Sequence, residues 1–240
     1  MSKKNVEQGD EQFATVENAL GKTEQFIENN KKILGYVIFG IVALVLIVMG
    51  YNKYIAKPNE LKAFNSMFRA EQYFEVDSFA VALNGDGVNP GFLDIIDDYG
   101  RTKSGNLARY YAGICYLQLA KNDSKISAKE YYQNAIDNLE DFSSDDKLIM
   151  PMAIGAIGDA YDELGKSDKA AKQYEKAAEF SENDFTSPMF LMKAGMIYAA
   201  TGNHEQALKM FEKIKTDFYT SSEGREIKKY IAREKTLLGK

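Results

Sequence analysis

The longest apolar stretch of this chain runs from Ile33 to Tyr51 and contains no charged side chain. As a helix it is about 28 Å long at a rise of about 1.5 Å per residue, close to the hydrocarbon thickness of a bilayer. A buried core helix of this length normally keeps a polar stripe, whereas every face of this stretch is apolar or glycine. The pattern therefore predicts a single transmembrane helix at residues 33–51.

The surroundings of this stretch favour a retained anchor over the alternative, a cleavable signal peptide. The apolar run is longer than the about 7 to 15 residues of a signal core, and no Ala-x-Ala site follows it. Lysines stand at both ends, and Tyr36, Tyr51 and Tyr54 fall at headgroup level. Basic residues are balanced across the span, so charge alone gives no orientation. Because a first apolar span commonly acts as an uncleaved signal, we expect residues 1–32 to form a cytoplasmic tail.

A second apolar pattern begins at Glu11 and predicts an amphipathic helix that ends near Asn29 and Asn30. Its apolar face consists of Phe13, Val16, Leu20 and Ile27. The polar face is mainly Glu, Gln and Asn, which anionic lipid does not attract, so we expect a protein partner for this tail helix. A frayed helix without a partner is the alternative.

After the span, the pattern of small and aromatic residues repeats itself. Two copies align at a constant offset of 37 residues: Gly158, Tyr161, Gly165, Ala170, Tyr174 and Ala177 with Gly195, Tyr198, Gly202, Ala207, Phe211 and Ile214. A third copy has Gly113 and Tyr116 and, displaced by a three-residue insertion, Ala128, Tyr132 and Ala135. Each copy predicts two helices joined by a tight turn, with small residues that let the helices approach closely.

These spacings resemble the tetratricopeptide repeat (TPR). Three repeats cover residues 106–221, although Ile154 and Leu191 stand where the repeat usually has a large aromatic and its closing proline is absent. A juxtamembrane helix and a degenerate repeat are expected in 52–105, with helices at 59–76 and 91–99. Residues 222–240 predict a capping helix whose apolar face is Ile227, Tyr230, Ile231 and Leu238. The predicted fold class is all-α: a single transmembrane helix followed by a TPR-like α-solenoid with a C-terminal capping helix.

The same resemblance implies a partner-binding groove on the first helix of each repeat. Its positions are Leu107, Tyr110, Ile114 and Leu117 in the first repeat, Met152, Gly155, Asp159 and Asp162 in the second, and Met189, Met192, Met196 and Ala199 in the third. We expect this groove to be apolar and rich in methionine, whose flexible side chain suits varied apolar partners. Coverage of these residues by the termini of the chain itself is the alternative.

Composition and isolated residues argue against several classes of function. The formal net charge of −5 argues against a nucleic-acid partner. The single cysteine, Cys115, allows no intrachain disulfide and is expected as a buried thiol. The only histidine, His204, lacks companion metal ligands and is expected as a solvated turn residue.

Two acidic segments also have a plain interpretation. Asp159, Asp162 and Glu163 predict a solvated or partner-facing patch on one helix edge. Residues 84–91 are rich in turn formers but lack the ligand series of a calcium loop, so they predict a connection. We therefore expect no catalytic residues, no metal, no cofactor and no enzyme activity.

A short acidic tail, one span and a domain of degenerate TPRs resemble the YfgM family of bacterial inner-membrane proteins. The resemblance implies an accessory, chaperone-like subunit of the SecYEG translocon, associated with the periplasmic membrane-anchored chaperone PpiD and with unfolded polypeptides. It places the chain in the lipid bilayer of the bacterial inner membrane as a single-pass protein, with a cytoplasmic N-terminus and a periplasmic C-terminal domain. The alternatives are a TPR scaffold of another envelope assembly, such as cell-wall or outer-membrane machinery, and an enzyme or its regulatory subunit.

Overall fold

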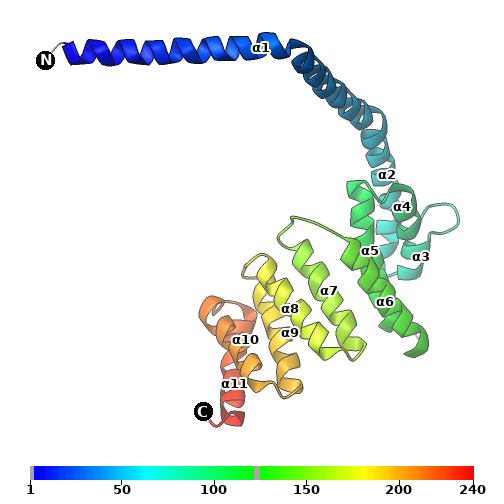
Figure 1. Cartoon of the computed structure of the whole chain (residues 1–240). Coiled ribbons are helices and arrows are strands. Elements are labelled where there is room, and N and C mark those ends of the chain that lie inside the picture. The colour runs from blue at the N-terminus through cyan, green and yellow to red at the C-terminus, as the bar shows by residue number, and fades with distance from the viewer. Residues whose placement is uncertain (1–2, 122–124) are drawn as a thin grey trace. The chain divides into compact units, whose positions relative to one another are not determined.

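The computed structural model describes residues 3–121 and 125–240, and the side chains of residue 21, of 24–121 and of 128–240. Within these ranges every regular element is a helix (Figure 1). The chain divides into two compact units, Met1–Pro58 and Asn59–Lys240. The predicted all-α class is confirmed.

The first unit consists mainly of one long helix, α1 (Lys3–Tyr51). The predicted helix end near Asn29 and Asn30 is wrong, because α1 continues through both residues to Tyr51. The side-chain amide of Asn30 donates to the carbonyl oxygen of Phe26 at 2.8 Å, one turn back in the same helix. Its apolar part has a mean hydropathy of 2.8 over 18 residues, none of them buried. This helix is long and apolar enough to cross a membrane. A five-residue π-helix, η1 (Asn52–Ala56), follows it.

Three helices precede the first predicted repeat, in the segment where a juxtamembrane helix and a degenerate repeat were expected. They are α2 (Lys57–Glu75), α3 (Phe79–Asn84) and α4 (Phe92–Tyr99), of which α3 was not expected. Their shared core contains Met67, Ala70, Leu83, Phe92 and Ile95, together with residues of the next helix, α5 (Lys103–Lys121). Helices α2, α3 and α4 therefore bury their apolar residues against α5, the first helix of the first repeat.

The turn-rich segment between α3 and α4 is organised by one carboxylate. Asp86 accepts hydrogen bonds from the backbone of Asn89 at 2.6 Å and of Val88 at 2.8 Å. It also accepts from the amide of Asn89 and the hydroxyl of Tyr73, both at 2.8 Å. These bonds hold the pKa of Asp86 well below its usual range. The carboxylate of Asp86 therefore stabilises the turn between α3 and α4.

A second carboxylate fastens α2 to the start of α5. Glu60 accepts from the backbone N–H groups of Lys103 at 2.6 Å and Ser104 at 3.1 Å, and from the Ser104 hydroxyl at 2.7 Å. The first N–H groups of a helix have no partner within it, so Glu60 caps α5 from a different helix. Burial opposes the charge of Glu60, but the hydrogen bonds from Ser104 and Lys103 outweigh it and lower its pKa.

Three helix pairs follow and form the predicted repeats, as successive antiparallel hairpins (Figure 1). The pairs are α5 with α6 (Lys125–Asp141), α7 (Ile149–Glu163) with α8 (Ser167–Phe180), and α9 (Thr186–Ala200) with α10 (His204–Asp217). In the last two pairs the glycine of the first helix lies under the aromatic ring of the second. A Cβ atom on Gly158 would lie 2.7 Å from the Tyr174 ring, and one on Gly195 would lie 2.4 Å from Phe211. The helices of these pairs can pack this closely because Gly158 and Gly195 have no side chain.

The first pair departs from this pattern. A Cβ atom on Gly113 would meet Leu139 at 2.5 Å, although the sequence alignment places Tyr132 at the position of Tyr174. Helix α5 continues eight residues beyond Gly113 to Lys121, whereas α7 and α9 end five residues beyond their glycines. The insertion therefore lengthens α5, and a residue two turns further along α6 packs on Gly113. Tyr132 lies instead beside the cleft described below.

The last helix, α11 (Ser222–Leu237), closes the array as predicted. Ile227 and Ile231 are buried against the core of the third repeat, and Tyr230 and Leu238 pack at its edge. The Ser221 hydroxyl accepts from the backbone N–H of Gly224 at 2.9 Å and caps the helix. The apolar end of the solenoid is thereby covered.

Candidate functional site: a cleft across the three repeats

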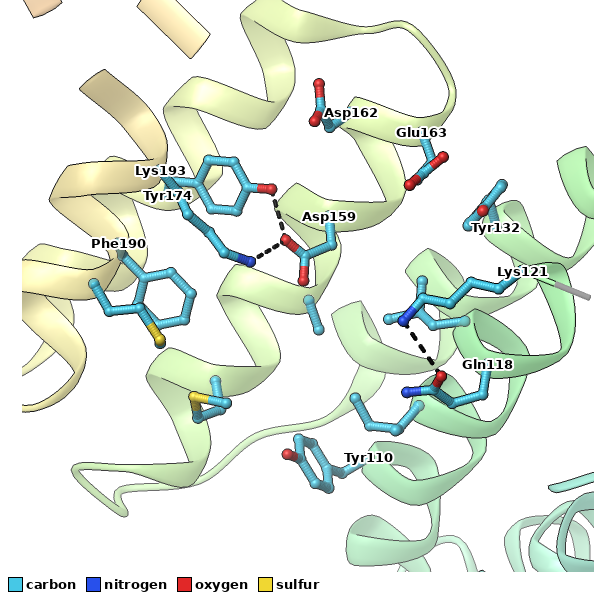
Figure 2. A pocket seen from close by; sticks show the side chains of 15 residues that line it. Tyr110, Gln118, Lys121, Tyr132, Asp159, Asp162, Glu163, Tyr174, Phe190 and Lys193 are labelled. Atoms are coloured by element: carbon cyan, nitrogen blue, oxygen red, sulfur yellow. Dashed lines mark hydrogen bonds and ion pairs between the residues drawn. The ribbon is translucent and has the colours of Figure 1, made fainter. Parts of the chain in front are cut away.

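A cleft of about 370 Å³ lies across α5, α7 and α9, the first helices of the three repeats (Figure 2). Its apolar lining comes from Tyr110, Ile114, Leu117, Met152, Ala156, Met189 and Phe190. Its charged lining comes from Lys121, Asp159, Asp162, Glu163 and Lys193. The cleft therefore combines apolar and charged side chains.

Seven of the twelve predicted groove positions line this cleft. They are Tyr110, Ile114 and Leu117 on α5, Met152, Asp159 and Asp162 on α7, and Met189 on α9. Leu107, Met192 and Ala199 are instead half-buried against the core clusters, and Met196 is exposed outside the cleft.

The expected composition of the groove needs correction. Of the methionines in α9 only Met189 reaches the cleft, and five charged side chains share its lining. Gly155, expected at the groove surface, is buried under Phe190, where an added Cβ atom would lie 1.9 Å from the ring. The ring of Phe190 thus reaches the cleft because α7 has no side chain at that position.

Asp159 is the centre of the polar contacts in the cleft (Figure 2). One of its oxygens accepts from the Tyr174 hydroxyl and from the Lys193 ammonium group, each at 2.6 Å. The same ammonium group lies 5.2 Å from the centre of the Tyr174 ring. Burial, the bond to Asp159 and nearby carboxylates raise the pKa of Tyr174, which therefore stays a hydroxyl donor. This network joins α7, α8 and α9 at one wall of the cleft.

One turn beyond Asp159, the end of α7 adds two more carboxylates to the rim of the cleft. Asp162 and Glu163 are exposed there, and Lys121 and Tyr132 line the same cleft (Figure 2). Burial and the charge of Glu163, to which the Tyr132 hydroxyl hydrogen-bonds, raise the pKa of Tyr132. Lys193 pairs with Asp159, so Asp162 and Glu163 against Lys121 leave the cleft with one excess negative charge. The predicted partner-facing patch of Asp159, Asp162 and Glu163 therefore divides into one paired and two exposed carboxylates.

The prediction that His204 is a solvated turn residue is wrong. Its Nδ1 atom lies 2.7 Å from a carboxylate oxygen of Glu234, a side chain that is only 1% exposed. The histidine begins α10 and Glu234 lies on α11, so the contact ties the capping helix to the third repeat. The residues are 30 positions apart in the chain, which explains why sequence spacing did not reveal the pair.

The structure also locates the remaining singled-out residues. Cys115 is buried, as predicted, and burial raises the pKa of its thiol to about 12. Among the described residues, no group of three or more His, Cys, Asp or Glu side chains is arranged to hold a metal ion. Of the tail helix face, Ile27 is exposed on α1, whereas the side chains of Phe13, Val16 and Leu20 lie outside the described residues.

Comparisons with known proteins agree with this architecture. Two models described as tetratricopeptide repeat match residues 153–184 and 190–220. The chain is similar to two crystal structures of a Podosopora anserina putative kinesin light chain with nearly identical TPR-like repeats. A variant of that protein with one substitution matches with a TM-score of 0.51 and 13% identity, over 78% of this chain and 90% of that one. The other structure matches with a TM-score of 0.50 and 13% identity, over 76% of this chain and 88% of that one.

No curated protein sequence matches the chain. At 13% identity the likeness to the solved structures concerns the fold alone. The two repeat matches cover the second and third helix pairs, whose glycines lie under aromatic rings, and leave out the first pair, which departs from that packing. The chain therefore contains tetratricopeptide repeats within an all-helical, TPR-like solenoid.

Proposed function

We propose that this protein is a membrane-anchored TPR module that binds polypeptide segments in the cleft across α5, α7 and α9. The observation that carries the proposal is the cleft itself, with an apolar floor and an acidic rim at the face where TPR helices hold peptides. A suitable segment pairs apolar side chains with a lysine or arginine, because Asp162 and Glu163 attract positive charge.

The proposed anchor is residues 33–51 of α1. Their apolar side chains are exposed within the described structure, and a bilayer would cover them. Tethering raises the local concentration of the solenoid near its partners, so weak binding in the cleft is sufficient. The tail helix face of Phe13, Val16, Leu20 and Ile27 offers a second contact on the other side of the membrane.

The proposed cellular role is that of an accessory, chaperone-like subunit of the SecYEG translocon in the bacterial inner membrane. The resemblance to the YfgM family supports this role, with the N-terminus in the cytoplasm and the solenoid in the periplasm. The partners are the translocon, a PpiD-like chaperone and unfolded polypeptides. Binding and tethering account for the function, and no chemical step is required.

The test places a photo-crosslinking residue at Met189 of the full chain in native membranes, followed by identification of the captured proteins. Capture of translocon subunits, a PpiD-like chaperone or translocating polypeptides supports the proposal. Capture of cell-wall or outer-membrane machinery contradicts the translocon role and favours the other envelope scaffold. No capture at Met189 contradicts binding in the cleft.

A matched pair of substitutions on α9 sharpens this test. Met189→Glu places a negative charge in the cleft, whereas Met196→Glu places the same charge at an exposed position two turns further along the same helix, outside the cleft. We expect Met189→Glu to weaken partner capture severalfold and Met196→Glu to leave it unchanged, with equal thermal melting of both variants. Equal capture by both variants contradicts the cleft as the binding site.

A further inference from the structure

Helix α2 has an exposed apolar face that the solenoid core does not use. Ala63, Met67 and Ala70 are buried against the neighbouring helices. Leu61, Phe64 and Phe68 are 61%, 67% and 58% exposed, and their spacing of three and four residues places them on one face of the helix. We call these three residues the α2 apolar face. Contiguous exposed apolar side chains of this size mark a surface that meets protein or lipid.

The charges around the α2 apolar face distinguish between these two partners. From residue 53 to residue 70 the chain has four basic side chains and one acidic one, although its formal net charge is −5. The basic residues are Lys53, Lys57, Lys62 and Arg69. The one acidic residue, Glu60, already caps α5 with its carboxylate. Helix α2 as a whole has three basic and three acidic residues, because Glu71 and Glu75 follow at its end, so the basic excess lies in the part that carries Leu61, Phe64 and Phe68. Phe and Leu on one face with basic residues beside them are the pattern of a segment that lies at an anionic membrane surface.

The position of α2 in the chain points to the same partner. The helix follows the apolar part of α1 after only the π-helix η1, so it is held within reach of the bilayer in which α1 is anchored. Within η1, Tyr54 is 73% exposed and the ammonium group of Lys53 lies 5.4 Å from the centre of its ring. Tyrosine and lysine are typical of the membrane–water interface. π-Helical turns and Pro58 are also sites where a helix changes direction, which lets α2 lie along a surface.

We propose that the α2 apolar face lies in the headgroup region of a bilayer that contains anionic lipids. This inference rests on the proposed membrane anchor, and it adds a second lipid contact made by the folded domain. Leu61, Phe64 and Phe68 enter the boundary between headgroups and acyl chains, and Lys57 and Arg69 pair with anionic headgroups beside it.

The absence of tryptophan from the chain makes a direct test available. Phe64→Trp is prepared in the full chain and reconstituted into vesicles of phosphatidylcholine with phosphatidylglycerol. Tryptophan fluorescence is measured with and without lipids brominated near the headgroup end of the acyl chain, which quench only tryptophans that touch lipid. Leu44→Trp, inside the proposed span, is quenched by lipids brominated deep in the acyl chain if the anchor exists.

The matched control is Lys62→Trp, which lies next to Leu61 in the chain but about 100° away around the helix. We expect severalfold stronger quenching for Phe64→Trp than for Lys62→Trp, and stronger quenching with phosphatidylglycerol than in pure phosphatidylcholine. Blue-shifted but unquenched emission of Phe64→Trp overturns the inference in favour of a protein cover, and red-shifted unquenched emission overturns it in favour of a free surface.

The two tryptophan variants distinguish failure of the α2 contact from failure of the membrane anchor. Quenching of Leu44→Trp without quenching of Phe64→Trp overturns the α2 contact and leaves the anchor intact. Absence of quenching at Leu44→Trp overturns the anchor and with it the proposed function. Equal quenching of Phe64→Trp in both lipid mixtures overturns the requirement for anionic headgroups.

Discussion

Helices α1 and α9 are both rich in apolar residues but hold them in opposite surroundings. In α9, Phe190, Leu191 and Ala194 are buried in the core of the third repeat. In α1, the large apolar side chains from Ile33 to Met49 are exposed within the described structure. Apolar content alone therefore does not determine the partner of a helix: α9 is enclosed by other helices, whereas α1 has a length and composition that suit lipid.

The largest effect should come from placing a charge in each helix. Leu191→Lys puts an ammonium group into a closed core and should destabilise the solenoid by more than about 3 kcal/mol, seen as a large fall in thermal melting by circular dichroism. Val45→Lys should cost about 2.5–3.5 kcal/mol of membrane insertion and leave solenoid melting unchanged. The second effect is measured as the fraction of chain released from membranes by alkaline extraction. A fall in solenoid melting for Val45→Lys would contradict the separation of the two regions.

Adding one methyl group to a glycine should have a smaller effect, which should again differ between the solenoid and α1. Gly155→Ala forces a Cβ atom to within 1.9 Å of the Phe190 ring, and the required shift should cost about 1–3 kcal/mol of solenoid stability. Gly40→Ala meets nothing within 4 Å on α1, so it should leave the solenoid unaffected and favour the helix by about 0.5–1 kcal/mol. Chemical unfolding of the two variants, monitored by circular dichroism, makes the comparison. Equal stability of both would mean that Phe190 moves aside without strain.

Buried polar contacts also distinguish the solenoid from the apolar part of α1. His204→Ala removes the closest partner of the buried Glu234 carboxylate, and the loss should be about 1–3 kcal/mol. The matched control is Lys229→Ala, which removes an exposed pair with Glu226 on the same capping helix and should change nothing measurable. Thermal melting reports both. If the control destabilises as much as His204→Ala, the buried pair has no special role in holding α11.

The smallest effect should depend on pH. The folded state lowers the pKa of Glu60, so its stabilising contribution is present above the pKa of the unfolded chain and is lost as the pH falls through the folded value. Glu60→Gln should therefore cost about 1 kcal/mol or less near pH 7, and the cost should shrink as the pH falls through the folded pKa of Glu60. Measurement of unfolding over this pH range, with the parent chain alongside, checks this. Insertion of residues 33–51 should not vary over this range, because no carboxylate or histidine lies among them.

Sequence spacing predicted the parts of the fold that depend on neighbours along the chain. The uncharged run from Ile33 to Tyr51 indicated α1 as a candidate span. The recurring Gly, Tyr and Ala positions indicated three hairpins, and the apolar face of residues 222–240 indicated the capping helix. Both patterns can be read from the sequence because residues three or four positions apart share one face of a helix. The end of the tail helix was missed since two asparagines do not stop a helix whose backbone remains hydrogen-bonded.

The cleft was predicted only in part. Tyr110, Ile114, Leu117 and Met189 were found from repeat positions, because these positions recur within single helices. Lys193 was missed because its role depends on Asp159, 34 residues away on another helix. Met152, Asp159 and Asp162 also came from repeat positions, whereas Met192 packs against the core of the third repeat and Met196 is exposed outside the cleft.

By itself, the sequence determined an apolar helix fit to cross a bilayer and a chain of helical hairpins, since both follow from residues that are close in the chain. Only the tertiary structure decided which groups meet across helices: Glu60 with the start of α5, His204 with Glu234, and Lys193 with Asp159. The physical reason is that these contacts depend on how helices tilt and stack after they form.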